Sequence, residues 1–209
     1  MKKSVLLSVL MALPLAGLAV GAQAGNAVAD VDAQVSTLGL GLGIAFPVGD
    51  SVDARAGFNQ FNKSFSTTTT NATSTINYNG NLKLSSIDLL ADWHPFDGMT
   101  HLTAGLMYNN NKFEATGIDQ ATGGTVNATV TFRKVAPYLG FGWSGQAKNT
   151  GWSFVSDIGV LFQGAPNAAL TTASPALAPN LATQQATLND KLKNFKYYPV
   201  VSIGVGYAF

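Results

Sequence analysis

The sequence predicts an all-β protein: an eight-stranded antiparallel transmembrane up-and-down β-barrel with short periplasmic turns and longer extracellular loops. Three observations support this fold class. Apolar residues recur at every second position in many segments. The connections between these segments alternate between short and long. The chain also begins with a stretch that is typical of an export signal.

The composition narrows the possible classes further. The chain has 209 residues, of which 46% are hydrophobic and only 11% are charged. Its 22 glycines argue against a helical bundle, and the absence of cysteine excludes disulfides and thiol metal sites. A formal charge of +1 is too small to indicate a nucleic-acid partner.

Residues 1 to 24 have the build of a signal peptide, which leaves residues 25 to 209 as the barrel domain. Lys2 and Lys3 precede an apolar region, and Ala22-Gln23-Ala24 forms a small-residue cleavage site. A transmembrane anchor is the alternative interpretation of this stretch. Removing two of the 12 basic residues leaves 10 against 11 acids, so the exported chain would carry a net charge of −1. No later run of about 18 apolar residues predicts a membrane-spanning helix.

The alternation defines the strands. The segment "LGLGLGIAF" is an example: its apolar side chains lie on one face, and glycine or alanine lies on the other. The apolar residues are Leu38, Leu40, Leu42, Ile44 and Phe46. The predicted strands are roughly 28 to 36, 38 to 46, 51 to 64, 79 to 94, 100 to 114, 126 to 143, 151 to 164 and 196 to 209. The alternation slips near Ser85-Ser86 and Arg133-Lys134, where we expect β-bulges. The segment "LATQQATLNDKLKNF" is loosely helical and predicts a short helix or an ordered loop outside the barrel.

A soluble β-sandwich would show the same alternation. The export signal, the Trp and Tyr residues near strand ends, and opposite faces that mix glycine with charge all favour the membrane barrel.

The face opposite the apolar stripe carries the candidate lumen-lining residues. The predicted inward acids are Asp30, Asp32, Asp53, Asp88, Asp92 and Asp157, with Arg55 and Arg133 as the inward bases. One interpretation is an acidic lumen that favours cations. The other is a core of ion pairs in which Arg55 bridges Asp88 or Asp92, and we favour it because barrels of eight strands are usually filled by side chains.

Inward glycines leave a second question open. Gly39, Gly41, Gly43, Gly204 and Gly206 give one wall almost no side-chain volume. This wall predicts either a narrow water path, or strong coiling with room for Tyr138 and Met107 from across the barrel.

Other candidate chemistry is sparse. His94 and His101 flank the predicted turn at residues 95 to 99 and could form a metal or pH-sensing pair, but we favour hydrogen-bonded residues that fill the barrel end. We expect no catalytic residue, no metal and no cofactor, so the chain is not predicted to be an enzyme.

The last strand, "PVVSIGVGYAF", predicts the seam of the barrel. Its apolar residues would face lipid while its glycines face inward. Tyr207 would belong to the inner aromatic girdle, and the terminal Phe209 resembles the aromatic signal by which assembly machinery recognises outer-membrane barrels.

The run "KVAPYLGFGWSGQAKNTGWSFVSDIGVLFQGAPNAALT", followed by "NDKLKNFKYYPVVSIGVGYAF", resembles the small outer-membrane proteins associated with carbapenem susceptibility and described as ornithine-uptake porins. These motifs are shared with other eight-stranded barrels, including the OmpA-like and OmpW-like groups. The resemblance implies a monomeric barrel in the outer membrane of a Gram-negative bacterium, one that passes or binds small cationic solutes such as basic amino acids.

Two functions are therefore expected. The first is a narrow channel or binding barrel for small cationic solutes. The alternative is a closed structural barrel that acts in envelope integrity or adhesion through its extracellular loops. In either case the expected partners are outer-membrane lipid, lipopolysaccharide and the assembly machinery, with no nucleic acid.

Overall fold

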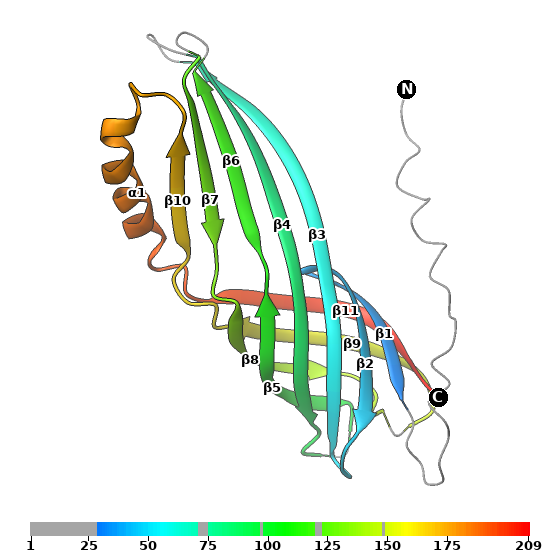
Figure 1. The fold of residues 1–209 in the computed structure, drawn as a ribbon. Helices are drawn as coiled ribbons and strands as arrows, with labels where there is room; N and C mark the ends of the chain where they lie inside the picture. Colours follow the sequence, from blue (N-terminus) through cyan, green and yellow to red (C-terminus); the bar gives the residue numbers. More distant parts are fainter. Residues whose placement is uncertain (1–28, 71–74, 97, 120–122, 148) are drawn as a thin grey trace, which may run out of the picture.

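A computed structural model describes residues 29–70, 75–96, 98–119, 123–147 and 149–209. Within these ranges the chain forms eleven antiparallel strands and one helix (Figure 1). The strands are β1 (Asp30–Ser36), β2 (Gly39–Pro47), β3 (Val52–Thr70), β4 (Thr75–Trp93), β5 (Thr100–Asn109), β6 (Lys112–Asp119), β7 (Thr125–Thr131), β8 (Val135–Trp143), β9 (Gly151–Leu161), β10 (Asn167–Thr172) and β11 (Tyr198–Ala208), and the helix is α1 (Ala178–Leu192). The predicted signal peptide lies outside the described residues.

Part of this sheet closes into a barrel-like ring. β1 pairs with both β2 and β11, and the pairing continues from β2 through β3, β4, β5, β8 and β9 back to β11. The seam between the first and last strands runs from Asp30 opposite Ala208 to Ser36 opposite Ser202. Closure leaves no free edge within the ring, so every strand of the ring finds its hydrogen-bond partners inside the sheet.

The strand count differs from the predicted eight because some segments are longer and more divided than their patterns suggested. β3 and β4 extend to Thr70 and Thr75, into the span expected to be a polar loop. The predicted strand at 100 to 114 divides into β5 and β6, and that at 126 to 143 into β7 and β8. β10 forms within the expected loop before the last strand.

The β-bulge expected near Ser85-Ser86 is wrong. β4 runs unbroken past Ser85 and Ser86, and its register with β3 is constant from Val52 opposite Trp93 to Thr70 opposite Thr75. Near Arg133 and Lys134 the strand is interrupted at residues 132 to 134. Its register against β5 and β6 is the same on both sides of the gap, but against β9 and β10 it shifts by one residue, from Tyr138 opposite Leu161 to Thr131 opposite Asn167. The chain therefore carries one extra residue on that side, as expected of a bulge. The cause is a change of neighbour, since β8 pairs with β9 whereas β7 pairs with β10.

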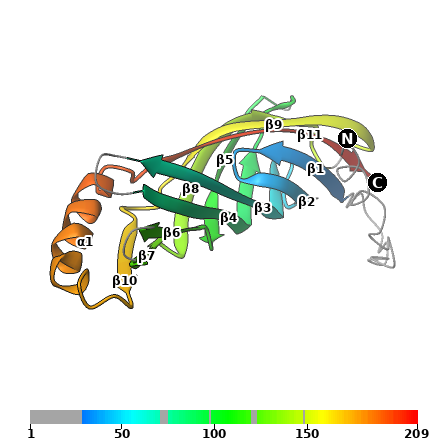
Figure 2. The same cartoon turned by 90° about the horizontal axis from the view of Figure 1, so that it is seen from above.

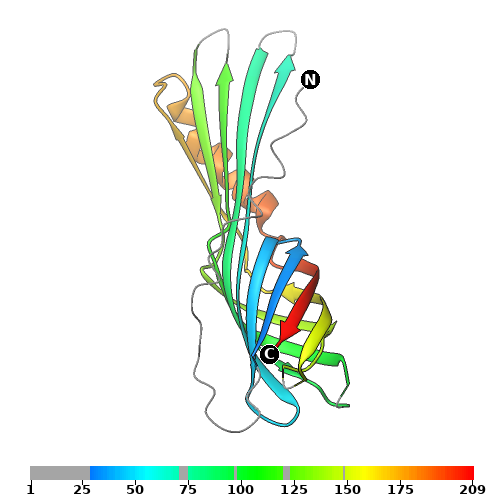
Figure 3. The same ribbon diagram turned by 90° about the vertical axis from the view of Figure 1, so that its right-hand side faces the viewer.

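Beyond the ring, the same sheet continues into a part that we call the distal sheet. It consists of residues 61 to 70 of β3 and 75 to 83 of β4, together with β6, β7 and β10. Figure 3 shows the β3–β4 and β6–β7 hairpins rising side by side above the ring. Seen from above, α1 lies at the far end of this sheet, beside β10 (Figure 2).

The helix confirms the helical pattern expected there. It begins at Ala178 with a proline in its first turn and ends at Leu192. Among the described residues, no helix is long and apolar enough to cross a membrane.

The polarity of both faces of the sheet reverses where the strands pass from the ring into the distal sheet. Around the ring, the outward face is apolar and exposed, as at Phe58, Ile87 and Tyr108. Where β3 and β4 continue into the distal sheet, this outward face becomes polar, with residues such as Asn62 and Asn81. The inward face reverses in the opposite sense, from buried polar residues inside the ring to aromatic residues such as Phe65 and Phe113, whose rings stack at 5.9 Å.

Candidate functional site

A buried ion-pair network spans the ring at its middle. Arg55 of β3 places Nη1 2.9 Å from Asp157 Oδ2 and Nε 2.9 Å from Asp92 Oδ2. β3 and β9 lie four positions apart in either direction around the ring of paired strands. The contact between Arg55 and Asp157 therefore crosses the full width of the interior. Only 8% of Arg55 is exposed.

Two residues of β5 complete this network. Thr103 Oγ1 donates a hydrogen bond to Asp92 at 2.6 Å and lies 3.3 Å from Asp157. His101 Nε2 lies 3.1 Å from Asp157 Oδ1, and because a carboxylate only accepts, Nε2 carries the proton. The other ring nitrogen, Nδ1, forms a hydrogen bond with the Ser144 hydroxyl at 3.1 Å. Asp157 thus receives hydrogen bonds or close contacts from three side chains on two other strands.

The end of the ring with the short turns is closed by the turn that follows β8. The backbone N–H of Ala147 donates to Asp53 Oδ2 at 3.1 Å, and both Ala147 and Gln146 are buried. His94 lies next to them, with Nε2 3.4 Å from Asp53 and Nδ1 donating to the Gly98 carbonyl at 3.0 Å. These contacts fill the lower opening with side chains and folded backbone.

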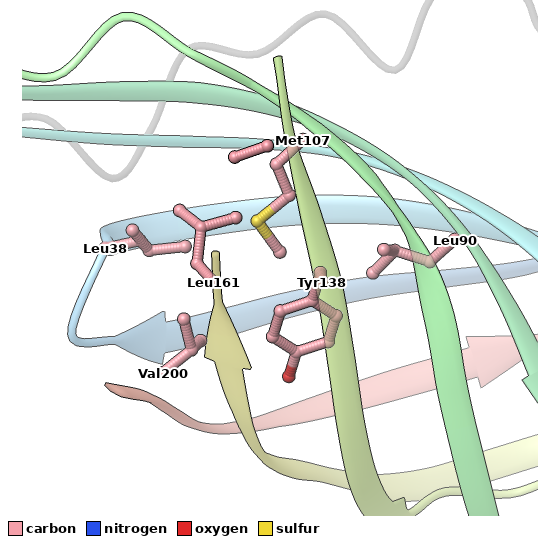
Figure 4. Close-up of a cluster of buried hydrophobic side chains, with 7 residues drawn as sticks. Leu38, Leu90, Met107, Tyr138, Leu161 and Val200 are labelled. Atoms are coloured by element: carbon pink, nitrogen blue, oxygen red, sulfur yellow. The ribbon is translucent and has the colours of Figure 1, made fainter. Parts of the chain in front are cut away.

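An apolar cluster lies on the other side of the network, toward the distal sheet. Figure 4 shows the side chains converging from several strands of the ring. Its members are Leu38, Leu90, Met107, Ala136, Tyr138, Leu161 and Val200. Tyr138 is the largest of them and is 2% exposed. The interior is therefore closed in three layers: the turn after β8, the ion-pair network and the apolar cluster.

The free space that remains between the network and the cluster is small. A cavity of about 20 Å³ is lined by residues of both layers, including Arg55, Asp88, Met107 and Tyr138. One ordered water needs at least about 10 to 15 Å³ of this kind of volume. The space accommodates one or two waters and is too small for an amino acid.

The inward glycines do not leave a water path beside the acids. A side chain at Gly43 would collide with the Asp32 carboxylate, and one at Gly41 would collide with Asn59 and Gln34. The missing side chains thus make room for polar groups of neighbouring strands. Tyr138 gains its space from Gly140 and Gly159 rather than from the wall that the sequence indicated.

Three aspartates of the interior have no cationic partner among the described residues. Asp88 accepts from Asn59 Nδ2 at 3.2 Å and Asp30 from Ser153 Oγ at 3.5 Å. Asp32 is 3% exposed, and its Oδ1 has no hydrogen-bond partner in the described structure. In all, six buried aspartates share the interior with one buried arginine. The interior is strongly acidic although it is filled.

The structure brings together some of the predicted site residues and separates others. Arg55 meets Asp92, as one interpretation of the sequence expected, but Asn59 rather than Arg55 contacts Asp88. The main partner of Arg55 across the ring, Asp157, was not anticipated as such, although alternation had placed it inward. Arg133 was expected inward, but it is exposed because it lies in the interruption between β7 and β8.

The residues expected to form an assembly signal lie on the outer surface. Tyr207 packs edge-on against Trp152 and Phe209, with ring centroids 5.1 Å apart in each pair. Phe209 donates its backbone N–H to Ala29 and leaves its side chain 62% exposed. This aromatic row is accessible from outside the ring.

One group of side chains in the described region has ligand atoms close enough for a metal ion. Atoms of Asp92, His101 and Asp157 lie within 4.8 Å of one another. The Arg55 guanidinium already lies 2.9 Å from each of the two carboxylates, so a cation at this place would meet a fixed positive charge. The residues therefore fit an ion-pair network better than a metal site.

Comparison with solved structures finds the same fold in two crystal structures from Acinetobacter baumannii. CarO matches 86% of this chain and 97% of its own, with 20% identity and a TM-score of 0.57. CarO2 matches 88% of this chain and 98% of its own, with 21% identity and a TM-score of 0.57. At these identities the likeness is one of fold, and at that level it confirms the predicted resemblance. No protein-family model and no curated protein matches the chain.

Proposed function

We propose that this chain is a small outer-membrane β-barrel protein whose ring crosses the bilayer as an eight-stranded barrel closed by its own side chains, and whose distal sheet acts outside the cell in envelope integrity or adhesion. The outer surface of the ring supports the membrane location. Large apolar side chains such as Leu40, Leu89 and Leu106 are more than half exposed there, which in water would be unfavourable.

Aromatic residues support the same orientation. Trp93, Trp143, Trp152 and Tyr207 gather at the ends of strands beside the short turns. Aromatic side chains of this kind favour the membrane–water interface. We infer that this end faces the periplasm, that the distal sheet lies outside the cell, and that the exposed row of Tyr207 and Phe209 contacts the assembly machinery during insertion.

The observation that supports a closed barrel is the contact of Arg55 with Asp157 across the width of the ring, with the apolar cluster behind it. Opening a path would require breaking a buried ion pair and displacing Tyr138. A buried pair broken on one side costs roughly 3 to 5 kcal/mol, so an open state would be rare.

Planar bilayer recordings test the closed barrel. The purified protein should give no conductance above protein-free bilayers in potassium, lysine or ornithine salts. A variant with Arg55, Asp92, Asp157 and Tyr138 all replaced by alanine removes the ion-pair network and the largest side chain of the apolar cluster, and it should gain conductance although the turn after β8 stays in place. Conductance of the unaltered protein would refute the closed barrel.

An envelope assay tests the role of the distal sheet. In a strain that lacks the protein, the full chain should restore detergent resistance or adhesion, whereas a chain with residues 166 to 195 replaced by a short turn should not. If both chains restored the phenotype equally, residues 166 to 195 would not be needed for the function.

A second candidate, a binding barrel for small cationic solutes, is favoured by the acidic interior. Asp30, Asp32 and Asp88 lack a cationic partner among the described residues, and carboxylates in a low-dielectric wall attract cations. Liposome swelling in lysine or ornithine tests this candidate. Uptake that is lost in Asp32→Asn with Asp88→Asn would support it, and no uptake above empty liposomes would exclude it.

A further inference from the structure

Three lysines gather on the outward surface where the apolar face of the ring gives way to the polar face of the distal sheet. Lys83 ends the distal part of β4, Lys112 begins β6, and Lys134 precedes β8. Just below them on the same face lie Ile87 and Tyr108, which are about half exposed. The lysines therefore stand at the height where an outer leaflet would end.

The register forces two of these charges together. Lys83 lies directly opposite Lys112 in the pairing of β4 with β6. Like charges directly opposite each other destabilise a sheet. Here one carboxylate bridges them, because Glu114 contacts Lys83 Nζ at 2.9 Å and Lys112 Nζ at 2.8 Å.

One carboxylate does not neutralise the cluster. The hydrogen bonds from Lys112 and Lys83 lower the pKa of Glu114, so it stays charged at neutral pH and cancels one of the two lysines. Lys134 adds a further positive charge, and its ammonium lies 5.9 Å from the centre of the Tyr108 ring. It contacts the neutral side chain of Asn110, two residues before Lys112. The four side chains together carry a net charge of about +2 at neutral pH.

We propose that Lys83, Lys112 and Lys134 form a binding site for the phosphate groups of a lipid headgroup in the outer leaflet, with lipopolysaccharide as the lipid. Lysine ammonium groups bind phosphate oxygens as point charges. Tyr108 and Ile87 below them provide apolar contact for the acyl chains of the same molecule. The site rests on the proposed outer-membrane location and adds to it a defined ligand chemistry.

Equilibrium binding of bisphosphorylated lipid A to the purified barrel in detergent tests the site. Replacing all three lysines by glutamine should weaken binding on the order of a hundredfold, because each lysine near an anionic surface contributes about fivefold. A matched control with Lys63, Lys191 and Lys193 replaced by glutamine loses the same charge elsewhere and should bind as the unaltered protein does. Heat-modifiable mobility on gels verifies that each variant is folded.

Two further arms separate the ligand chemistry. Glu114→Gln removes the bridging carboxylate and should tighten lipid A binding severalfold. Lipid A stripped of its phosphates should bind the unaltered protein as weakly as phosphorylated lipid A binds the triple variant. Equal binding of both lipids, or an equal loss in the control variant, would overturn the site, and so would inorganic phosphate binding as tightly as lipid A.

The failure of this site is distinguishable from failure of the proposed function. Cell fractionation reports whether the unaltered protein is in the outer membrane, independently of lipid A binding. A protein found there whose triple variant binds normally would refute the lysine site alone.

Discussion

At the scale of single residues, Asp157 holds the centre of the ring together. Its buried carboxylate accepts hydrogen bonds from Arg55 of β3 and from His101 and Thr103 of β5. A buried carboxylate with this many donors stays charged, and Arg55 Nη1 and His101 Nε2 depend on it, because these two atoms would otherwise lose their hydrogen-bond partner in a dry interior.

Asp157→Asn should therefore lower the free energy of unfolding by roughly 3 to 5 kcal/mol, as expected when one partner of a buried ion pair is removed. Urea unfolding in lipid vesicles, followed by tryptophan fluorescence, measures this. Asp190→Asn serves as the control, because Asp190 forms an exposed pair with Lys193 on α1 and should change stability by less than about 0.5 kcal/mol. Equal effects of the two changes would contradict the network.

Gly159 shows how tightly the interior is packed, because Tyr138 lies directly against its backbone. A methyl group there would lie 2.6 Å from the Leu139 carbonyl and collide with the Tyr138 hydroxyl. The backbone cannot move aside and Tyr138 is buried on all sides, so the added group has no space to occupy.

Gly159→Ala should destabilise the barrel by about 1 to 3 kcal/mol, the usual cost of overpacking a filled core. The same unfolding experiment measures it. Gly49→Ala is the matched control, because a methyl group at Gly49 meets nothing within 4 Å and should be nearly neutral. If Gly159→Ala were also neutral, Tyr138 would have freedom that the structure does not indicate.

At the scale of elements, α1 protects the edge strand of the distal sheet. β10 pairs with β7 on one side only. On its other side, Gln185 Oε1 accepts from the Leu170 N–H at 2.9 Å, and Asn189 both accepts from the Ala168 N–H at 2.8 Å and donates to the Ala168 carbonyl at 3.0 Å. The helix amides occupy the positions that a further strand would take, which prevents edge-to-edge pairing.

Replacing Gln185 and Asn189 by alanine should speed amide exchange at Ala168 and Leu170 while leaving exchange in the ring unchanged, because the lost bonds belong only to β10. Hydrogen exchange with mass spectrometry measures both regions. Gln184→Ala with Thr187→Ala changes two exposed residues of the same helix and should leave β10 protected. Unchanged exchange in the first variant would mean that the helix amides do not hold the edge.

At the scale of the whole molecule, the ring and the distal sheet are parts of one continuous sheet with different outward surfaces. β3 and β4 run through both parts, and their outward faces turn from apolar to polar at the rim. This change along the strands is the one that the proposed function requires, with lipid around the ring and water around the distal sheet.

Substituted cysteines test this orientation cleanly because the natural chain has no cysteine. Thr68→Cys, high on the distal sheet, should react with a membrane-impermeant maleimide on intact cells. Val48→Cys, in the exposed turn after β2, should react only after the cells are broken. The reverse pattern would place the distal sheet in the periplasm and contradict the proposed function.

Much of this architecture could be predicted from alternation alone. The period of two located every strand of the ring, although it joined β5 to β6 and β7 to β8. It also placed six aspartates opposite the apolar face, where the structure buries them: Asp30, Asp32, Asp53, Asp88, Asp92 and Asp157. The helix after β10 was also visible in its spacing of leucines. These properties are local, since a strand in a closed ring must present one face to each environment.

The distal sheet could not be predicted in the same way. Its strands are rich in Ser, Thr and Asn on one face, a composition that is also typical of loops. Residues 61 to 70 and 75 to 83 are strands because they pair with each other in one long hairpin and because β6 pairs with residues 76 to 83. The change of partner from β10 to β9 divides β7 from β8 at residues 132 to 134.

The sequence by itself determined the antiparallel class, the faces of the strands and the acidic character of the interior, because each follows from the side-chain order along a strand. The tertiary structure decided that Arg55 reaches Asp157 rather than Asp88, and that the space over the glycines is filled. It also decided that Lys83 stands opposite Lys112. These outcomes depend on the register and closure of the ring, which bring residues far apart in the sequence into contact, such as Arg55 and Asp157, 102 positions apart.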